Sequence, residues 1–361
     1  MMCLMNKTIV FTGGGTAGHV TPNIALIERL RSEAWQCIYI GSSQSIEEDL
    51  MAQQSVRFFS IATGKLRRYF SWQNFLDPFK ILYGTLQAFY YLKKIKPTIV
   101  FSKGGFVSFP VVLAAWLCRI PLIAHESDLT PGLTTKLSVP FVRYVCVTFD
   151  KAKQFFKNKQ HVKVTGTPLR QSLFKGEQAK GLALCQFDSS KPCLLIIGGG
   201  LGSVAINTMV RNCLDALLPH FHVVHLCGKG KVDESIKQDG YRQFDYVNEE
   251  MPDLYAMADL VISRSGANSV CEILALNKPH IFIPLPLNAS RGDQIHNAKH
   301  CQSLELSRVL DEETLTVDVL CDAVNDVHAH ASEVIARIKT LGLSSGTDKI
   351  IDLIKEVASS Q

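Results

Sequence analysis

The chain has 361 residues, 47% of them hydrophobic and 20% charged, with a net charge of +5 at neutral pH. This length favours two domains, and the composition is that of packed globular cores rather than of a disordered chain. The small net charge gives no reason to expect a nucleic-acid partner. Every apolar stretch falls short of the ~20 residues that span a bilayer, and the first residues lack the apolar segment of a signal peptide.

Eleven cysteines are spread along the chain without a C-x-x-C pair. Several stand inside apolar runs, as Cys37 does, which is typical of small core residues in a reducing cytosol. We therefore expect neither a disulfide framework nor a zinc site. No metal and no organic cofactor are predicted.

A strand–turn–helix unit opens the first half of the chain. A run of β-branched and aromatic residues at 8–11 is followed by Gly13-Gly14-Gly15-Thr16-Ala17-Gly18-His19 and by a helical pattern over residues 22–31. Pro22 suits the first turn of a helix, where its missing N–H would have no partner. Further strands are predicted at residues 37–40, 99–101, 122–124 and 144–147. This order is typical of a doubly wound parallel sheet.

Residues 65–96 have an unusual composition. They hold nine of the chain's 31 aromatic residues, and seven basic residues against one acid, Asp77. Basic residues interleaved with aromatic ones suit a segment lying on an anionic membrane surface. A packed core helix with solvated lysines accounts for the same pattern, and this alternative stays open. The residues that we expect at the membrane are Lys65, Arg67, Arg68, Trp72 and Phe75.

Two polar loops follow predicted strands of the first half. The sequence Ser102-Lys103-Gly104-Gly105-Phe106-Val107-Ser108 comes after residues 99–101, and His125-Glu126-Ser127-Asp128 comes after residues 122–124. The carboxyl ends of parallel strands meet at one edge of a sheet, where such folds bind ligands. We therefore expect both loops to converge with His19, although a lone histidine or acid more often has a structural role.

The same strand–turn–helix unit restarts at residue 193. An apolar run at 193–197 leads into Gly198-Gly199-Gly200-Leu201-Gly202-Ser203 and a helical pattern over residues 204–218. Further strands are predicted at residues 222–226, 260–263 and 280–284. Two such starts predict two doubly wound α/β domains. We place them at residues 1–165 and 166–342, with a C-terminal helix at about 343–361 packing back on the first domain.

The two glycine turns are candidate phosphate sites. Glycine lets backbone N–H groups approach a phosphate, and the positive end of the following helix adds attraction. Neither turn has the G-x-G-x-x-G pattern of a dinucleotide site or the Lys-Ser/Thr of a P-loop. A sugar nucleotide, held in a cleft between two domains that face each other, fits better than a dinucleotide or ATP.

Two more polar segments follow strands of the second half. Arg264-Ser265-Gly266-Ala267-Asn268-Ser269-Val270-Cys271-Glu272 offers a turn, a helix cap and then a carboxylate one turn inside the helix. Such a carboxylate can accept hydrogen bonds from a ribose diol, or it can be an ordinary acid of a helix surface. The segment Arg291-Gly292-Asp293-Gln294-Ile295-His296-Asn297-Ala298 is either a ligand loop or a helix-capping turn.

These pieces, in this order, resemble the MurG family of bacterial UDP-N-acetylglucosamine:N-acetylmuramyl-(pentapeptide) pyrophosphoryl-undecaprenol N-acetylglucosaminyltransferases. The resemblance runs from the first glycine turn to residues 294–298 and includes Gly166-Thr167-Pro168-Leu169-Arg170. It implies an α/β GT-B fold and an inverting, metal-independent transfer of N-acetylglucosamine from UDP-GlcNAc to the 4-hydroxyl of lipid I. It also places the protein at the cytoplasmic face of the bacterial inner membrane.

The resemblance also implies roles for individual residues. His19 would be the catalytic base or position the acceptor, with Glu126 as its competitor. Glu272 would bind the ribose, Gln294 the N-acetylglucosamine, and Val247 with the residues from Ala267 the uracil and phosphates. The residues implied at the donor site are Thr16, Ala17, Gly18, Asp128, Arg170, Gly200, Val247, Ala267, Asn268, Ser269, Glu272 and Gln294.

The sequence departs from the family pattern at several of these places. Gly200 stands where serine is frequent, Leu201 where an amide is frequent, and Asp128 where asparagine is common. Alternatives to the implied activity are a diacylglycerol glucosyltransferase of the same fold, a UDP-N-acetylglucosamine 2-epimerase, and a non-catalytic scaffold that only binds a UDP-sugar.

Overall fold

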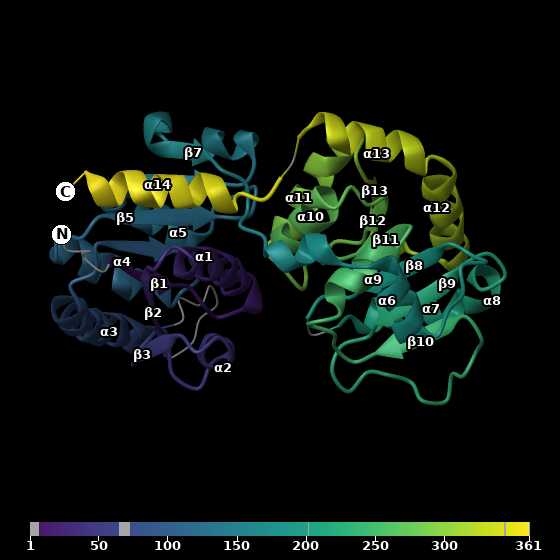
Figure 1. The fold of residues 1–361 in the computed structure, drawn as a ribbon, viewed down its shortest axis with the longest axis horizontal. Coiled ribbons are helices and arrows are strands. Elements are labelled where there is room, and N and C mark those ends of the chain that lie inside the picture. Colours follow the sequence, from purple (N-terminus) through teal and green to yellow (C-terminus); the bar gives the residue numbers. More distant parts are fainter. Residues whose placement is uncertain (1–6, 65–72, 201, 343, 361) are drawn as a thin grey trace. The chain divides into compact units, whose positions relative to one another are not determined.

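The computed structural model describes residues 7–64, 73–200, 202–342 and 344–360. The chain divides into two compact units (Figure 1). Unit 1 comprises Met1–Arg170 and Ser345–Gln361, and unit 2 comprises Gln171–Ser344. The first boundary therefore follows residue 170, where the sequence placed it after residue 165.

Unit 1 is built on a seven-stranded sheet in the order β3-β2-β1-β4-β5-β6-β7, with every neighbouring pair parallel. Its strands are β1 Thr8–Thr12, β2 Gln36–Ser42, β3 Arg57–Ile61, β4 Ile99–Ser102, β5 Leu122–Glu126, β6 Tyr144–Val147 and β7 Val162–Val164. Its α-helices are α1 Thr21–Arg31, α2 Ile46–Gln53, α3 Gln73–Ile95, α4 Ser108–Leu117, α5 Leu133–Ser138 and α14 Thr347–Ser359.

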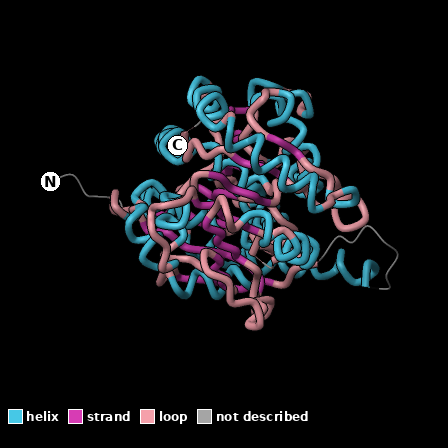
Figure 2. Tube along the Cα trace, turned by 90° about the vertical axis from the view of Figure 1, so that its right-hand side faces the viewer, coloured by secondary structure: helices cyan, strands magenta, loops and turns pink. Residues whose placement is uncertain are grey.

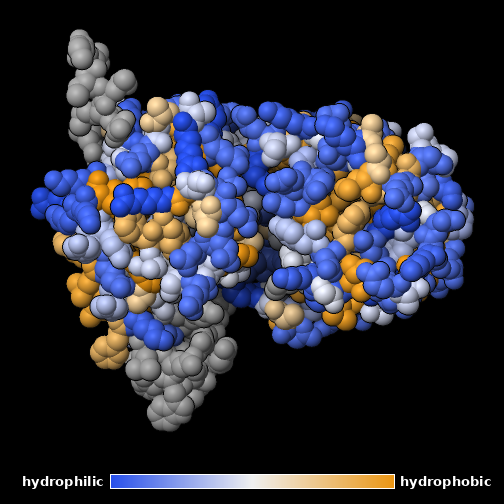
Figure 3. Space-filling view, turned by 60° about the horizontal axis from the view of Figure 1, so that its bottom comes forward, coloured by the Kyte–Doolittle hydropathy of each residue, from blue (hydrophilic) through white to orange (hydrophobic). Residues whose placement is uncertain are grey.

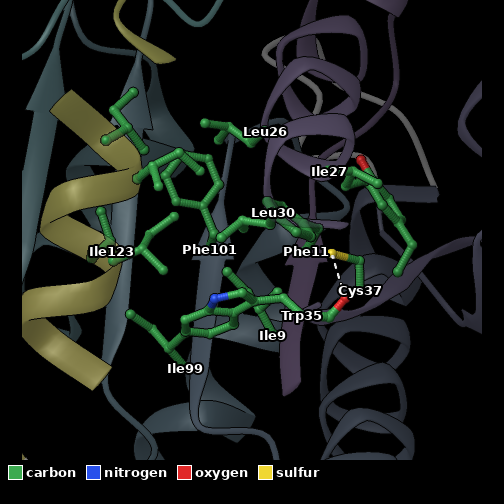
Figure 4. Packing of buried hydrophobic residues seen from close by; sticks show 14 of the residues in the cluster. Ile9, Phe11, Leu26, Ile27, Leu30, Trp35, Cys37, Ile99, Phe101 and Ile123 are labelled. Carbon is green, nitrogen blue, oxygen red and sulfur yellow. Dashed lines mark hydrogen bonds between the residues drawn. The ribbon is translucent and has the colours of Figure 1, made fainter. Parts of the chain in front are cut away.

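Alternating side chains of this sheet enter two different cores, as the two-residue period of a strand requires. On one face Ile9 and Phe11 pack with α1 and α14, whereas Val10 on the other face belongs to a cluster with α3 and α4 residues. Figure 4 shows Phe101 and Ile123 of the sheet in the first of these clusters, near α14 and the α1 residues. The C-terminal helix thus packs back on unit 1.

Unit 2 is built on a six-stranded parallel sheet in the order β10-β9-β8-β11-β12-β13. Its strands are β8 Cys193–Ile197, β9 His222–Leu226, β10 Tyr241–Phe244, β11 Leu260–Ser263, β12 His280–Phe282 and β13 Arg308–Val309. Its α-helices are α6 Gln178–Cys185, α7 Val204–Asn212, α8 Leu214–Leu217, α9 Met251–Met257, α10 Ala267–Ala275, α11 Asp293–Ser303, α12 Val317–Ala329 and α13 Ala331–Thr340. Figure 2 shows helices, in cyan, flanking the magenta strands.

The structure corrects the limits of several predicted elements. β5 continues to Glu126, so His125 and Glu126 belong to the strand rather than to the loop after it. The predicted strand at 280–284 ends at Phe282. The predicted helix over 204–218 breaks at Cys213 into α7 and α8, which turns Leu214 and Leu217 into the core. No helix within the described ranges combines the length and apolarity needed to cross a bilayer.

Candidate active site

Each sheet has one point where the direction of chain progression reverses. In unit 1 the chain runs outward from β1 through β2 to β3, then returns to β4 on the other side of β1. In unit 2 the corresponding point lies between β8 and β11. Ligands of open α/β sheets bind in the crevice at the carboxyl ends of the strands at such a point. The two predicted glycine turns follow β1 and β8 and therefore lie at these positions.

The glycines of the first turn are crowded by the protein itself. A Cβ atom on Gly14 would lie 2.5 Å from the Glu47 carboxylate, and one on Gly15 would lie 2.5 Å from the Phe106 ring. Gly105, which follows β4, has a φ of +79° and would carry a Cβ 2.1 Å from the carbonyl oxygen of Gly14. At such distances a side chain would collide with its neighbours, so packing is a sufficient reason for glycine at these positions.

A buried polar network supports the first turn. The hydroxyl of Tyr39 donates to the carbonyl oxygen of Gly13 at 2.6 Å, and the Asn23 amide donates to the Tyr39 oxygen at 3.1 Å. The fully buried Glu47 carboxylate accepts from the Ser42 hydroxyl at 2.5 Å and from the N–H of Gly15 at 3.4 Å. These bonds hold the turn against β2, α1 and α2.

His19 ends a short 3₁₀ helix, Ala17–His19, within the first turn. Its Nδ1 lies 3.0 Å from the Thr16 hydroxyl oxygen, and its ring is only partly buried. When Nδ1–H donates to Thr16, the lone pair of Nε2 can accept a proton. A Cβ on Gly104 would lie 3.9 Å from His19 Cδ2, so the ring stands beside the loop after β4. The structure thus brings His19 and this loop together, as the sequence predicted.

Glu126 is buried and accepts three hydrogen bonds from the loop and helix that follow β5. The donors are the N–H of Asp128 at 3.2 Å, the N–H of Gly132 at 2.9 Å and the Thr135 hydroxyl at 2.6 Å. A carboxylate held in this way orders the loop that carries Asp128. His19 is the more accessible of the two candidate bases.

His125 is bonded to the loop that follows β7. Its Nε2 donates to the carbonyl oxygen of Gly166 at 2.9 Å. Burial and the nearby charge of Lys103 hold the pKa of His125 well below its usual range, so the ring stays neutral. Lys103 is itself buried and donates to the Ser127 hydroxyl at 2.5 Å, which ties the loops after β4 and β5 together.

Arg170 is the last residue of the first segment of unit 1, and it lies near Glu28 of α1. Desolvation raises the pKa of Glu28, and the positive charge of Arg170 opposes that shift. This neighbour belongs to the second half of α1, whereas Thr16, Ala17 and Gly18 precede that helix.

The second glycine turn is open where the first is crowded. A Cβ on Gly199 or Gly200 would meet no atom of the described residues within 4 Å. The two ends of the turn are packed, since a Cβ on Gly198 would lie 2.8 Å from the backbone nitrogen of Ser203 and one on Gly202 would lie 1.8 Å from the Cys227 carbonyl oxygen. The Ser203 hydroxyl accepts from the N–H of Ile206 and caps α7. The turn therefore presents backbone at the N-terminus of a capped helix, which is the geometry of an anion site.

Arg264 ties this edge of unit 2 together from a buried position. Its guanidinium donates to the carbonyl oxygens of Ile283 and Pro284, each at 3.1 Å, and to the Ser203 hydroxyl at 2.6 Å. It also forms an ion pair with Glu312. Its side chain is thus a framework element that joins the ends of β11 and β12 to the cap of α7.

The predicted ribose and sugar residues follow β11 and β12. Gly266 caps α10, the first turn of which holds Ala267, Asn268 and Ser269. Glu272 lies in the second turn, where its Oε2 accepts from the hydroxyl of Tyr255 at 3.4 Å.

Gln294 lies in the first turn of α11. Its side-chain oxygen Oε1 accepts from the N–H of Leu285 at 3.1 Å, and its backbone carbonyl oxygen accepts from the Ser265 hydroxyl at 2.8 Å. α10 and α11 therefore begin side by side. Val247 lies apart from them in sequence, half-buried in the loop between β10 and α9.

The predicted membrane residues Lys65, Arg67, Arg68 and Trp72 lie outside the described residues, and Phe75 lies in α3 at a position whose side chain is not described. The rest of α3 has two faces. Ala88 and Leu92 are buried in the core, whereas five large apolar residues are each at least 59% exposed. These are Phe79, Leu82, Tyr83, Leu86 and Tyr90. Figure 3 shows hydrophobic side chains, in orange, exposed on the surface of unit 1.

Comparison with known proteins gives matches along the whole chain. Residues 9–147 match the glycosyltransferase family 28 N-terminal domain, and residues 193–354 match the family 28 C-terminal domain. The UDP-N-acetylglucosamine--N-acetylmuramyl-(pentapeptide) pyrophosphoryl-undecaprenol N-acetylglucosamine transferase of Legionella pneumophila strain Paris is 55% identical over 358 residues, 99% of each chain. The enzyme of the same name from Clostridium perfringens is 47% identical over 97% of this chain and 98% of its own.

The chain belongs to the MurG family. Among solved structures, the crystal structure of Acinetobacter baumannii MurG matches with a TM-score of 0.76 and 26% identity, covering 97% of this chain and 99% of that one. The two parallel-sheet units are those of a GT-B glycosyltransferase, as the sequence predicted.

The sequence alone does not identify the buried side chains that hold the candidate site residues in place. Glu47 follows a Ser45 cap and was indistinguishable from a solvated acid in the first turn of a helix. Tyr39 and Tyr255 stand in apolar runs that signal core. Lys103 belongs to a predicted loop, but nothing in the sequence indicates its bond to Ser127. In each case the decisive fact is a contact between residues far apart in sequence, which no local pattern carries.

Proposed function

We propose that the protein transfers N-acetylglucosamine from UDP-N-acetylglucosamine to the 4-hydroxyl of N-acetylmuramyl-(pentapeptide) pyrophosphoryl-undecaprenol, with inversion at the anomeric carbon. The observation that carries the proposal is membership of the MurG family along 99% of the chain. The presence of a glycine turn at the reversal point of each sheet supports it, since each unit then offers one ligand crevice. Unit 2 takes the donor and unit 1 the acceptor.

Three features favour unit 2 as the donor site. The open backbone at Gly199 and Gly200 leaves room for a diphosphate at the N-terminus of α7. The first turn of α10 offers further N–H groups, from Ala267 to Ser269. Glu272 is partly exposed one turn later, and its carboxylate can accept hydrogen bonds from a ribose diol. Val247 and Gln294 would contact the uracil and the sugar.

In the proposed reaction His19 is the base. The acceptor hydroxyl loses its proton to Nε2 of His19 as its oxygen attacks the anomeric carbon from the face opposite UDP. The bond from that carbon to the diphosphate oxygen breaks, and UDP leaves with the electron pair. The helix N-terminus at α7 and the cation of Arg170 stabilise the charge that develops on UDP. Thr16, Ala17, Gly18 and Asp128 would line the acceptor side of the donor sugar, and Glu126 would keep Asp128 in place.

The test is transfer of labelled N-acetylglucosamine by the purified protein to a lipid I analogue. Product with the N-acetylmuramyl-pyrophosphoryl acceptor and none with diacylglycerol supports the proposal. Transfer of glucose to diacylglycerol, or release of free sugar with a changed configuration at C2, would replace it with one of the other enzymes of this fold. Tight binding of UDP-N-acetylglucosamine without product on any acceptor would indicate a scaffold. Full activity in EDTA is expected, because the cation of Arg170 and the helix termini take the place of a metal.

We also propose that the exposed apolar face of α3 contacts the anionic cytoplasmic surface of the inner membrane, where a polyprenol-linked acceptor resides. Phe79, Leu82, Leu86 and Tyr90 recur at helical spacing on this face, and Lys93 and Lys94 follow them, exposed, in its last turn.

Replacing Leu82 and Leu86 by Gln should weaken partitioning onto vesicles of anionic phospholipid, measured by sedimentation, by about a hundredfold or more. Burial of one leucine side chain contributes roughly 1.5–3 kcal/mol, and about 1.4 kcal/mol is a factor of ten in a binding constant. UDP affinity should stay unchanged. A matched double variant on the exposed face of α13, Ser332→Gln with Thr340→Gln, should sediment as the natural protein does. Unchanged sedimentation of the α3 variant would remove this face from the proposal.

A further inference from the structure

Tyr255 is a buried residue of unit 2 that the proposed reaction does not use. It lies in α9, and its side chain is only 1% exposed. Its hydroxyl donates to Oε2 of Glu272, in the second turn of α10, at 3.4 Å. The phenol therefore reaches from the core to a partly exposed carboxylate, and this contact joins two helices that are separate in sequence.

The direction of this hydrogen bond is fixed. Burial raises the pKa of Tyr255 well above its usual value, and the negative charge of Glu272 adds to the shift. The phenol thus keeps its proton at any working pH, and an ionised carboxylate can only accept. Since a buried hydroxyl without an acceptor is unfavourable, Tyr255 also holds Glu272 in the rotamer that satisfies it.

We infer that Tyr255 is a positioning residue for recognition of the ribose, and that it acts through Glu272. A glutamate on a helix surface has several accessible rotamers, and ordering it on binding opposes affinity. Tyr255 removes part of that loss in advance by fixing the carboxylate from its buried side. The inference rests on the proposed donor site, because it requires Glu272 to accept from the 2′- and 3′-hydroxyls of a uridine nucleotide.

The inference makes Tyr255 a determinant of selectivity for ribose over deoxyribose. In Tyr255→Phe the ring and its packing remain, whereas the donor to Glu272 is lost. We expect UDP to bind about fivefold more weakly, the effect of one hydrogen bond. The binding of 2′-deoxy-UDP and 3′-deoxy-UDP should change less, so the ratio of deoxy-UDP to UDP dissociation constants should fall by a similar factor.

The experiment measures dissociation constants for UDP and both deoxy analogues by calorimetry. The matched control is Tyr241→Phe. Tyr241 is also a buried tyrosine of unit 2, but its hydroxyl bonds His225 Nδ1 at 2.9 Å rather than Glu272. A change at the second turn would affect phosphate binding of UDP and of both deoxy analogues alike, so the deoxy-to-UDP ratio of Tyr241→Phe should equal that of the natural protein. A second pair compares Glu272→Ala with Glu272→Ala/Tyr255→Phe, which should bind UDP equally well because the path through Glu272 is already absent.

The possible outcomes separate this inference from the proposed function. If the natural protein fails to discriminate UDP from its deoxy analogues, the ribose role of Glu272 fails, and the inference fails with it. If the natural protein discriminates and Tyr255→Phe keeps the full ratio, only the inference is overturned. A loss of UDP affinity that is as large in the Glu272→Ala background would also overturn it. Should Tyr255→Phe not fold, Tyr255→Met replaces it, because this flexible side chain also fills the site and lacks the hydroxyl, and a full deoxy-to-UDP ratio there would contradict the inference.

Discussion

The two glycine turns look alike in sequence and differ in what makes glycine necessary. At the first turn the side chains of Glu47 and Phe106 occupy the space that Cβ atoms would need. At the second turn Gly200 has no described atom within 4 Å of its Cβ position, and its backbone does not require a positive φ. Glycine at the first turn is thus required by the fold, whereas none of the described residues requires it at Gly200.

The supports beneath the turns differ as well. Below the first turn Tyr39 and Asn23 form a network of groups that do not change charge near neutral pH. Beside the second turn Tyr241 bonds His225, His225 bonds Asn207, and Asn207 donates to the Cys227 carbonyl oxygen, against which Gly202 packs. The second support therefore contains a titratable ring. The first turn is therefore closely packed and held by uncharged groups, whereas the second is open and held by a chain that contains an ionisable ring.

The largest expected effect separates turnover at the first turn from binding at the second. His19→Ala should lower kcat by about 10²–10⁴-fold, the usual contribution of a general base. The affinity for UDP, measured by calorimetry, should stay within about twofold, because His19 lies in unit 1 and UDP is proposed to bind unit 2. A variant that keeps its kcat would return the role of base to another residue, with Glu126 the first to examine.

Acid should destabilise unit 2 more than unit 1. In unit 2 burial lowers the pKa of His225 to about 3 and that of His280 to about 4. In unit 1 burial lowers the pKa of His125 well below its usual value. These rings are neutral when folded, so below pH ~6.5 the unfolded chain binds protons that the folded chain does not. The free energy of unfolding is therefore highest above that pH. For each ring it falls by up to about 1.4 kcal/mol per pH unit as the pH decreases.

The measurement is hydrogen exchange by mass spectrometry at pH 7.0 and 5.0 in moderate denaturant, with opening free energies obtained for each unit. Unit 2 should lose about twice as much as unit 1. The three tryptophans, at positions 35, 72 and 116, all precede residue 170. Their fluorescence therefore follows unit 1 alone and provides an internal check. Equal losses in the two units would contradict the prediction.

Gly14→Ala should damage the fold at the first turn. The added methyl group would meet the buried Glu47 carboxylate, which is held by Ser42 and by the neighbouring N–H of Gly15. Overpacking of this kind costs about 1–3 kcal/mol. Tryptophan fluorescence during urea unfolding should show the loss, and UDP affinity of the folded variant should be unchanged. A variant as stable as the natural protein would mean that Glu47 moves aside freely.

Gly200→Ala should have the smallest effect. The methyl group meets nothing within the described structure, so stability should stay the same or rise slightly. UDP affinity should change by less than about threefold, because serine, which is frequent at this place in the family, also carries a Cβ atom beside the open backbone. Calorimetry and thermal unfolding on the same sample measure both quantities. A loss of affinity of about tenfold or more would contradict this prediction and show that the diphosphate leaves no room for a methyl group.

The sequence predicted the inner strands of both sheets and none of the edge strands. β1, β2, β4, β5, β6, β8, β9, β11 and β12 were found within a few residues of their limits, because a strand buried on both faces is a continuous apolar run. The four that were missed, β3, β7, β10 and β13, are the four edges. Most of their side chains are only partly buried or exposed, and polar residues interrupt them, so the run of apolar residues on which the prediction depends is absent.

The candidate site was predictable to the extent that it follows inner strands. His19, Gly200, Ala267 and Gln294 all come directly after such strands or begin the next helix. What stayed hidden is the direction of side chains. His125 and Glu126 were read as loop residues, but β5 extends through both, and their side chains serve Gly166 and the loop at 128–135 instead. Successive side chains of a strand point to opposite faces of the sheet, so residues that continue the strand are directed differently from residues of a loop.

The packing of α14 on unit 1 has a consequence for how the protein is made. Ile350, Ile351, Ile354 and Val357 of this helix are buried in the core that holds Phe11 and Phe101. Unit 2 is inserted between α14 and the rest of unit 1, so a ribosome must synthesise all of residues 171–344 before that core can close. Until then the hydrophobic surface around Phe101 is uncovered, and nascent chains that stall inside unit 2 present it to chaperones and proteases. The unit that begins first along the chain is therefore the one that finishes folding last.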